Sequence, residues 1–253
     1  TFAHAPREFL RALYDAAVGE ALDRIAHAEG IVRRGLVLAL LTSLKQICNH
    51  PAHYLDDGSA LDGRSAKLEA FDDLIDSASE ARSDDRSEPT LVFTQYVVMA
   101  KLLASHLSER GISHAILHGS LSPTERQRLT DEFQAGHIDV LVCSLRAAGT
   151  GLTLTRATQV IHYDRWWNPA VEDQATDRAH RIGQTATVSV HRLISEGTLE
   201  ERVAEVLGQK RQLAGAVMGT GVDGWIGGLN DGELGELLRR QRPGGAASSE
   251  DAA

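Results

Sequence analysis

The sequence predicts an α/β domain in which helices cover both faces of a parallel β-sheet. From Thr90 onward, short apolar runs alternate with amphipathic stretches that are each about one helix long. Five runs fit strands: LVFTQ (91–95), HAILHG (114–119), VLVCS (140–144), QVIHYD (159–164) and VSVHRLIS (188–195). Apolar strands separated by helix-length connections are typical of a parallel sheet that is buried on both faces.

Three helix-start signals support this alternation. SPTE (122–125) combines a capping box with a proline at the first helical position, and NP (168–169) is a second pairing of a cap with a proline. TLEE (198–201) is a third capping signal. We therefore expect helices to begin directly after Ser122, Asn168 and Thr198.

Two further amphipathic stretches precede the sheet. In 7–28, apolar residues recur near the helical period, and we expect this stripe to need a covering partner. Its members are Phe9, Leu13, Ala16, Ala17, Leu22 and Ile25. In 65–78, a second apolar face lies opposite the acidic residues, whose predicted role is a solvated surface. That face consists of Leu68, Phe71, Leu74 and Ile75.

These patterns divide the chain into five segments. We expect a helical segment over 1–50, an acidic helix and linker over 51–88, the α/β lobe over 89–200, a helical C-terminal brace over 201–240 and a disordered tail over 241–253. The brace contains an expected small docking element, formed by Trp225, Ile226, Leu229, Leu234, Leu237 and Leu238.

The composition is that of a globular protein, with 42 % hydrophobic residues and a net charge of -9 over 253 residues. The acidity is local, because 51–88 carries -7 while 89–194 carries +1. The net charge therefore does not argue against a phosphate-binding surface in the central block. No apolar run reaches about 18 residues, so we expect neither a membrane span nor a membrane partner.

The two cysteines, Cys48 and Cys143, lie far apart, which excludes a disulfide framework and fits a cytoplasmic protein. Cys48, His50 and His53 lie close together, but no second ligand cluster completes a zinc site. A helix end followed by a turn is the favoured interpretation, and we expect no metal. The chain begins at Thr1 without an initiator Met or a signal-like segment, which favours a piece of a longer polypeptide.

Two loops at predicted strand ends are candidate anion sites. Gly149 and Gly151 follow the strand at 140–144 and permit a close backbone approach to an anion. Gly119 and Ser120 lie at the end of the run that begins at His114, and they precede a helix N-terminus. For either loop taken alone, a tight turn without a ligand is the simpler interpretation.

The stretch NPAVEDQATDRAHRIGQ (168–184) is more specific. If its helix runs from Asn168 to a stop at Gly183, then Gln174, Arg178 and Arg181 fall on one stripe. We expect the two arginines to be exposed. The alternative is a surface salt-bridge cluster, because Glu172, Asp173 and Asp177 lie beside Arg178 in the sequence.

Taken in order, these motifs resemble a known family. LVFTQY, LHGSLSPTERQRLTDEFQAG, LRAAGTGLTL, VIHYDRWWNP and QATDRAHRIGQ resemble the successive motifs of the second RecA-like lobe of SWI/SNF-type ATPases, which are superfamily two helicases. LKQICNHP is similar to the segment that precedes this lobe, and the tail around Trp225 is similar to bacterial members. The resemblance extends from about Leu40 to Leu238, and it implies a RecA-like fold.

The resemblance also implies how the lobe meets a nucleotide. Arg178 and Arg181 match arginine fingers that reach the phosphates of ATP, and Gly149, Gly151 and Gln174 lie on the nucleotide side. The chain has no G-x-x-x-x-G-K-[ST] motif. We therefore expect ATP and Mg²⁺ to be bound mainly by an N-terminal RecA-like lobe of the same protein.

The implied macromolecular partner is double-stranded DNA, gripped through its phosphates without base specificity. The matching residues are Gln95, Gly119, Ser120, Ser144, Arg146 and Trp167. Trp166 is expected in the core. Thr153 and Ala148 depart from the family pattern, which usually has Asn and often Gly at these positions. A place at the bacterial nucleoid, with transcription or repair machinery as a further partner, follows from the same resemblance.

Two other functions stay open at this point. The chain could be a binding module for nucleic acid or protein that kept the fold without catalysis, although paired arginine fingers favour a motor. The second alternative is the lobe of an RNA helicase, which the WWNP and DRAHRIGQ motifs disfavour.

Overall fold

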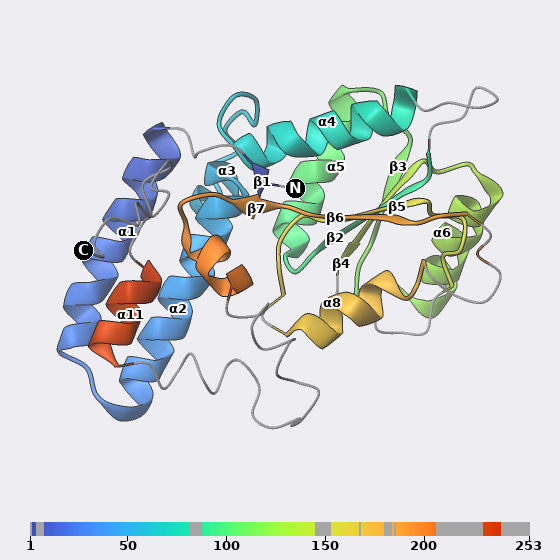
Figure 1. Ribbon diagram of the computed structural model, residues 1–253. Coiled ribbons are helices and arrows are strands. Elements are labelled where there is room, and N and C mark those ends of the chain that lie inside the picture. The colour runs from blue at the N-terminus through green and yellow to red at the C-terminus, as the bar shows by residue number, and fades with distance from the viewer. Residues whose placement is uncertain are drawn as a thin grey trace, which may run out of the picture.

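The computed structural model describes residues 2–3, 8–80, 88–144, 153–166, 168–179, 184, 186–205 and 230–238. Its centre is a five-stranded sheet in the order β3-β4-β2-β5-β6, and all neighbouring strands are parallel (Figure 1). The strands are β2 (Thr90–Thr94), β3 (His114–Leu117), β4 (Val140–Ser144), β5 (Gln159–His162) and β6 (Ser189–Arg192). The predicted parallel sheet is confirmed, because each of the five apolar runs supplies one of its strands.

Two further short strands form a separate parallel pair. These are β1 (Phe2–Ala3) and β7 (Ile194–Ser195), with Phe2 in register with Ile194. The run 188–195, predicted as one strand, is thus divided at Leu193 between the main sheet and this pair.

Helices cover both faces of the main sheet, as predicted. They are α4 (Ala66–Glu80), α5 (Val97–Glu109), α6 (Pro123–Ala135) and α8 (Pro169–Thr176). Side chains alternate along β2: Leu91 and Phe93 join the core that α6 and α8 cover, whereas Val92 joins the core beneath α4 and α5. In Figure 1, α4 and α5 accordingly lie on one side of the strands and α8 on the other.

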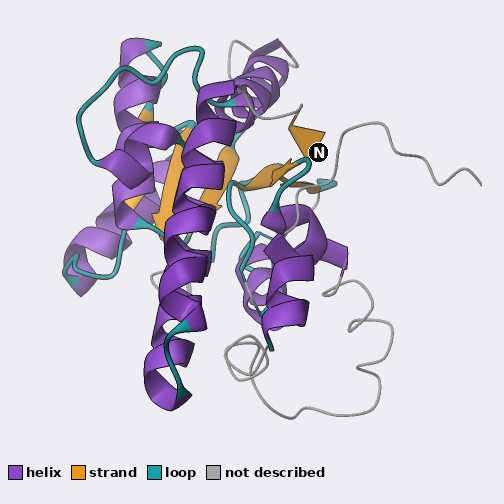
Figure 2. Cartoon of the chain, turned by 90° about the vertical axis from the view of Figure 1, so that its left-hand side faces the viewer, coloured by secondary structure: helices purple, strands orange, loops and turns teal. Residues whose placement is uncertain are grey.

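A third core lies beside the sheet. It joins α1 (Glu8–Ala26), α2 (Gly30–Asn49), the helical residues 199–205 and α11 (Asp231–Leu238). A hydrogen bond links its parts, because the Leu199 backbone N–H donates to the Tyr14 hydroxyl at 3.1 Å. In the turned view, helices of this group stand in front of the strands (Figure 2). A short helix, α3 (Pro51–Leu55), follows α2.

The stripe predicted for the first helix is only partly right. Phe9 is 51 % exposed and Ala16 is exposed, whereas Leu10 and Tyr14 are buried. The buried face is shifted because it is set by contacts with α2 and 199–205, distant segments that helical periodicity within 7–28 does not identify. Ile25 is buried as predicted.

The predicted helix starts are confirmed by cap geometry. The Ser122 hydroxyl accepts from the Glu125 N–H at 3.1 Å, and the Asn168 side chain accepts from the Ala170 N–H at 3.0 Å. The Thr198 hydroxyl accepts from the Glu200 N–H at 3.2 Å at the start of 199–205. Each start therefore has a side chain that satisfies a free backbone donor.

The C-terminal predictions fall partly within the described residues. Leu234, Leu237 and Leu238 of the expected docking element are buried in the third core. Trp225, Ile226, Leu229 and the tail at 241–253 lie outside the described residues. Among the described helices, none combines the length and the apolar character that a membrane crossing needs.

Candidate functional site at the carboxyl edge of the sheet

The carboxyl ends of the strands meet at one edge because all the strands run in the same direction. Thr94 at the end of β2 is in register with Ser144 at the end of β4, and Leu117 of β3 is in register with Cys143. The loops that follow β3, β4 and β2 therefore start side by side. Four of the residues predicted to contact DNA come from these three strand ends: Gln95, Gly119, Ser120 and Ser144.

These four residues differ in accessibility. Gly119 and Ser120 are exposed, and a Cβ placed on Gly119 would meet no atom within 4 Å. The Ser120 hydroxyl lies 2.8 Å from Nδ1 of His118. Ser144 is buried at the end of β4. The 118–122 loop is thus open to solvent, whereas Ser144 lies beneath the edge.

The Gln95 side chain is held by its neighbours. Its amide nitrogen donates to Asp164 Oδ1 at 2.9 Å and to the Arg165 carbonyl at 2.6 Å, and its backbone N–H donates to Asp164 Oδ1 at 3.0 Å. The Asp164 carboxylate also accepts from the Thr94 hydroxyl and from Asn49 Nδ2. Asp164 is fully buried, so it fixes the ends of β2 and β5 relative to each other.

The helix that carries the predicted arginine stripe is shorter than expected. It ends at Thr176, and Arg178 lies in the following turn, where its carbonyl accepts from the Leu154 N–H at 3.0 Å. This bond to a segment 24 residues earlier in the chain fixes the turn in place of a further helical turn. The stripe is consequently broken, with Gln174 exposed on α8 and Arg178 only 6 % exposed. The expectation that Arg178 is exposed was wrong.

Two of the three acidic residues near Arg178, Glu172 and Asp173, pair with other arginines. Glu172 Oε1 accepts from Arg165 Nε at 2.7 Å, and its other oxygen lies 3.4 Å from Arg192 Nε. Asp173 lies 3.7 Å from the Arg192 guanidinium. Within the described residues, no carboxylate pairs with Arg178, and its buried Nε has no hydrogen-bond partner there. The salt-bridge cluster exists, but among the described residues it leaves Arg178 out.

The ionisation of Glu172 follows from its partners. Burial raises the pKa of this carboxyl, but the hydrogen bond and charge of Arg165, together with His162 and the Trp166 N–H, outweigh burial and bring the pKa below its usual value. Glu172 therefore stays charged at neutral pH and holds Arg165 and the Trp166 N–H, the latter at 2.9 Å. Trp166 packs against the sheet core, as predicted.

The remaining predicted site residues lie outside the described residues: Arg146, Gly149, Gly151, Trp167 and Arg181, together with Ala148. Thr153 is described and is exposed.

The sequence cluster around Cys48 forms the end of α2 and the start of α3. His50 caps α3, with Nδ1 accepting from the Ala52 N–H at 3.0 Å and Nε2 lying 2.9 Å from the Leu61 carbonyl. The rings of His53 and Tyr96 meet edge to face, with their centroids 4.8 Å apart. Both nitrogens of His50 are thus engaged within the protein. The favoured helix end is present, although a short helix follows it in place of a turn.

Sequence reasoning missed a set of buried ionic groups behind this edge. Lys67 donates to both oxygens of Glu200, at 2.7 and 2.6 Å, and both side chains are almost inaccessible. Lys45, also buried, donates to the Arg165 carbonyl. The available signal was Lys45, a charged residue within the predominantly apolar stretch GLVLALLTSLKQI.

Known proteins share this architecture. Residues 66–183 match the family of helicase conserved C-terminal domains. YwqA of Bacillus subtilis, named as an ATP-dependent helicase/translocase, is 44 % identical over 229 residues, which cover 89 % of this chain and 24 % of YwqA.

Two solved structures from Sulfolobus solfataricus are also similar. The C-terminal domain of a SWI2/SNF2 ATPase has a TM-score of 0.79 at 33 % identity, covering 96 % of this chain and 97 % of that one. A SWI2/SNF2 ATPase core in complex with double-stranded DNA has a TM-score of 0.82 at 36 % identity, covering 96 % of this chain and 50 % of that one.

The parallel sheet, its two helical layers and the motifs at its carboxyl edge define an α/β lobe of the helicase type. The chain belongs to the C-terminal helicase domains of the SWI2/SNF2 ATPases. This confirms the resemblance found in the sequence. The chain spans about a quarter of the length of YwqA, 24 %.

Proposed function

We propose that this chain is the C-terminal motor lobe of an ATP-dependent double-stranded DNA translocase. In this proposal Arg178 and Arg181 act as arginine fingers on ATP, which is held with Mg²⁺ mainly by an N-terminal RecA-like lobe of the same protein. Gly149, Gly151 and Gln174 lie on the nucleotide side. The lobe grips DNA phosphates through the loops at the carboxyl edge of its sheet, together with Arg146 and Trp167.

The observation that carries the proposal is that Arg178 is nearly buried but has no carboxylate partner among the described residues. A nearly buried guanidinium normally pairs with a carboxylate, because an unpaired buried charge is costly. Here the neighbouring Glu172 and Asp173 are engaged by Arg165 and Arg192, and no described carboxylate pairs with Arg178. An arginine kept in this state suits a partner that arrives from outside the lobe, such as the transferring phosphate of ATP.

Membership of the family supports the nucleotide and DNA parts of the proposal. YwqA is named as ATP-dependent, and the Sulfolobus core was solved in complex with double-stranded DNA. This chain has no phosphate-loop motif of its own. A division of labour between two lobes therefore accounts for both the arginines and the missing motif.

The first prediction concerns the 253-residue chain on its own. We expect it to fold and to show no DNA-stimulated ATP hydrolysis, because fingers cannot act without the phosphate and metal ligands of a second lobe. A steady-state assay with and without duplex DNA measures this. Stoichiometric, DNA-stimulated turnover by the pure chain would contradict the proposal.

The second prediction concerns DNA affinity. We expect weak binding to duplex DNA that is insensitive to sequence and falls steeply with salt, because phosphate contacts release counterions. Fluorescence anisotropy across a salt series measures it, and Arg146→Ala should weaken binding equally on unrelated sequences. Tight binding that survives high salt, or a clear base preference, would favour the alternative of a binding module.

A further inference from the structure

A chain of buried polar contacts links the third core to the carboxyl edge of the sheet. It begins at the Lys67–Glu200 pair, where Lys67 Nζ also donates to Asn49 Oδ1 at 3.2 Å. Asn49 Nδ2 in turn donates to Asp164 Oδ2 at 3.2 Å. Asp164 holds Gln95, as described above. Five separate segments of the chain therefore meet in one hydrogen-bonded network.

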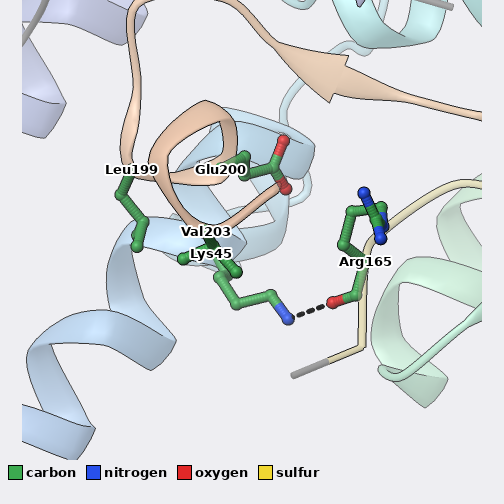
Figure 3. A pocket seen from close by; sticks show the side chains of 5 residues that line it. All are labelled: Lys45, Arg165, Leu199, Glu200 and Val203. Carbon is green, nitrogen blue, oxygen red and sulfur yellow. Dashed lines mark hydrogen bonds between the residues drawn. The ribbon is translucent and has the colours of Figure 1, made fainter. Parts of the chain in front are cut away.

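Lys45 enters the same network one helical turn before Asn49 on α2. Its Nζ donates to the carbonyl oxygen of Arg165, and this oxygen also accepts from Gln95 Nε2 at 2.6 Å. Lys45 of the helical segment and Gln95 of the candidate DNA edge thus share one acceptor atom. Figure 3 shows Lys45 reaching this carbonyl beside a small recess, which is lined also by Leu199, Glu200 and Val203.

Burying the charged Lys45 side chain costs free energy. Burial lowers the pKa of the Lys45 amine to about 8, although the carboxylates of Asp164 and Glu200 oppose this change. A buried ionic group often stabilises a fold no more than an apolar residue of similar volume would. Stability alone therefore does not explain a lysine here, whereas fixing the turn after β5 does.

We propose that Lys45 is a positioning residue for the candidate DNA edge: by holding the Arg165 carbonyl, it fixes the 164–166 turn, to which the Gln95 side chain is tied through both of its amide donor bonds. This inference rests on the proposed function, because it assigns Lys45 an effect on the DNA contacts of that same edge. Asn49 holds the same turn through its hydrogen bond to Asp164. Two residues of α2, Lys45 and Asn49, thus fix the turn at the candidate DNA site.

The test uses Lys45→Met in the full-length protein, because methionine keeps the apolar stem and removes the donor. The matched control is Lys101→Met, a lysine exposed on α5. We expect the DNA concentration for half-maximal turnover to rise by up to about tenfold in Lys45→Met, because the 164–166 turn loses a hydrogen bond from a charged donor. Turnover at saturating DNA should stay near the parent value, and the melting temperature should fall by only a few degrees, because the same bond also stabilises the fold.

A double variant tests the route of the effect. Gln95→Ala and Lys45→Met should together raise the half-saturating DNA concentration by less than the product of their separate effects, because both act through one carbonyl. Fully multiplicative effects would overturn the inference. A half-saturating DNA concentration at the parent value in Lys45→Met would also overturn it. A large drop in the melting temperature of Lys45→Met would do the same, because it would show that Lys45 mainly stabilises the fold.

Failure of the proposed function gives a different result. In that case the parent itself shows no DNA-stimulated turnover, and the inference falls with it. An active parent with an unaffected Lys45→Met variant overturns the inference alone.

Discussion

Arg178→Ala in the full-length protein is expected to lower DNA-stimulated ATP turnover by about 10³-fold or more, the loss typical of a removed arginine finger. The reason is that a finger acts on charge that develops only in the transition state of phosphoryl transfer. Arg181→Ala should have a comparable effect. The two losses should be less than additive, because both groups act on one transition state.

The burial of Arg178 decides how this experiment must be controlled. Because the side chain is only 6 % exposed, alanine also removes the packing of its apolar stem. Arg178→Lys keeps most of the stem and the charge but not the planar fork, so we expect a near-parental melt with little recovery of turnover. Parental turnover in the lysine variant, or a melt lowered as far as in the alanine variant, would mark Arg178 as a structural residue.

The second large effect is expected on stability. Lys67→Met leaves the Glu200 carboxylate buried without its partner, which costs about 3–5 kcal/mol. At 2–4 °C per kcal/mol, the melting temperature of this chain should fall by roughly 10 °C. Thermal unfolding followed by circular dichroism measures the change.

The double variant Lys67→Met with Glu200→Leu is the control. It removes both charges, so it should recover much of the lost stability, because a buried pair replaced by apolar groups is often neutral. If the double variant is as unstable as the single one, the role of Lys67 is packing and not compensation of the Glu200 charge. An unchanged melt in Lys67→Met would contradict the account of this pair.

The sheet and the helix starts were predictable because their signals are local. An apolar run such as 140–144 and a cap such as Ser122 with Pro123 specify their structures from a few adjacent residues. The buried pair was not predictable in this way. Lys67 and Glu200 are 133 residues apart, and a lysine in an amphipathic helix reads as a solvated residue unless its distant partner is known.

In the candidate site, too, features with local signals were predictable and features that depend on distant contacts were not. Sequence order identified the loops at the carboxyl edge, because strand direction alone brings them together. It did not show that Gln95 is held by Asp164, or that α8 ends at Thr176, because both depend on contacts with distant segments. The Leu154 N–H that fixes the turn at Arg178 belongs to such a segment.

The most direct measurement of the central claim compares two nucleotide affinities in the full-length protein with DNA present. ADP with aluminium fluoride mimics the transferring phosphate, whereas ADP alone does not. If Arg178 is a finger, Arg178→Lys should weaken binding of the mimic by about 10²-fold or more while ADP affinity stays at the parent value, because the contact exists only in the transition state. Equal affinity of variant and parent for the mimic, or an equal loss for both ligands, would contradict the claim that this lobe supplies an arginine finger.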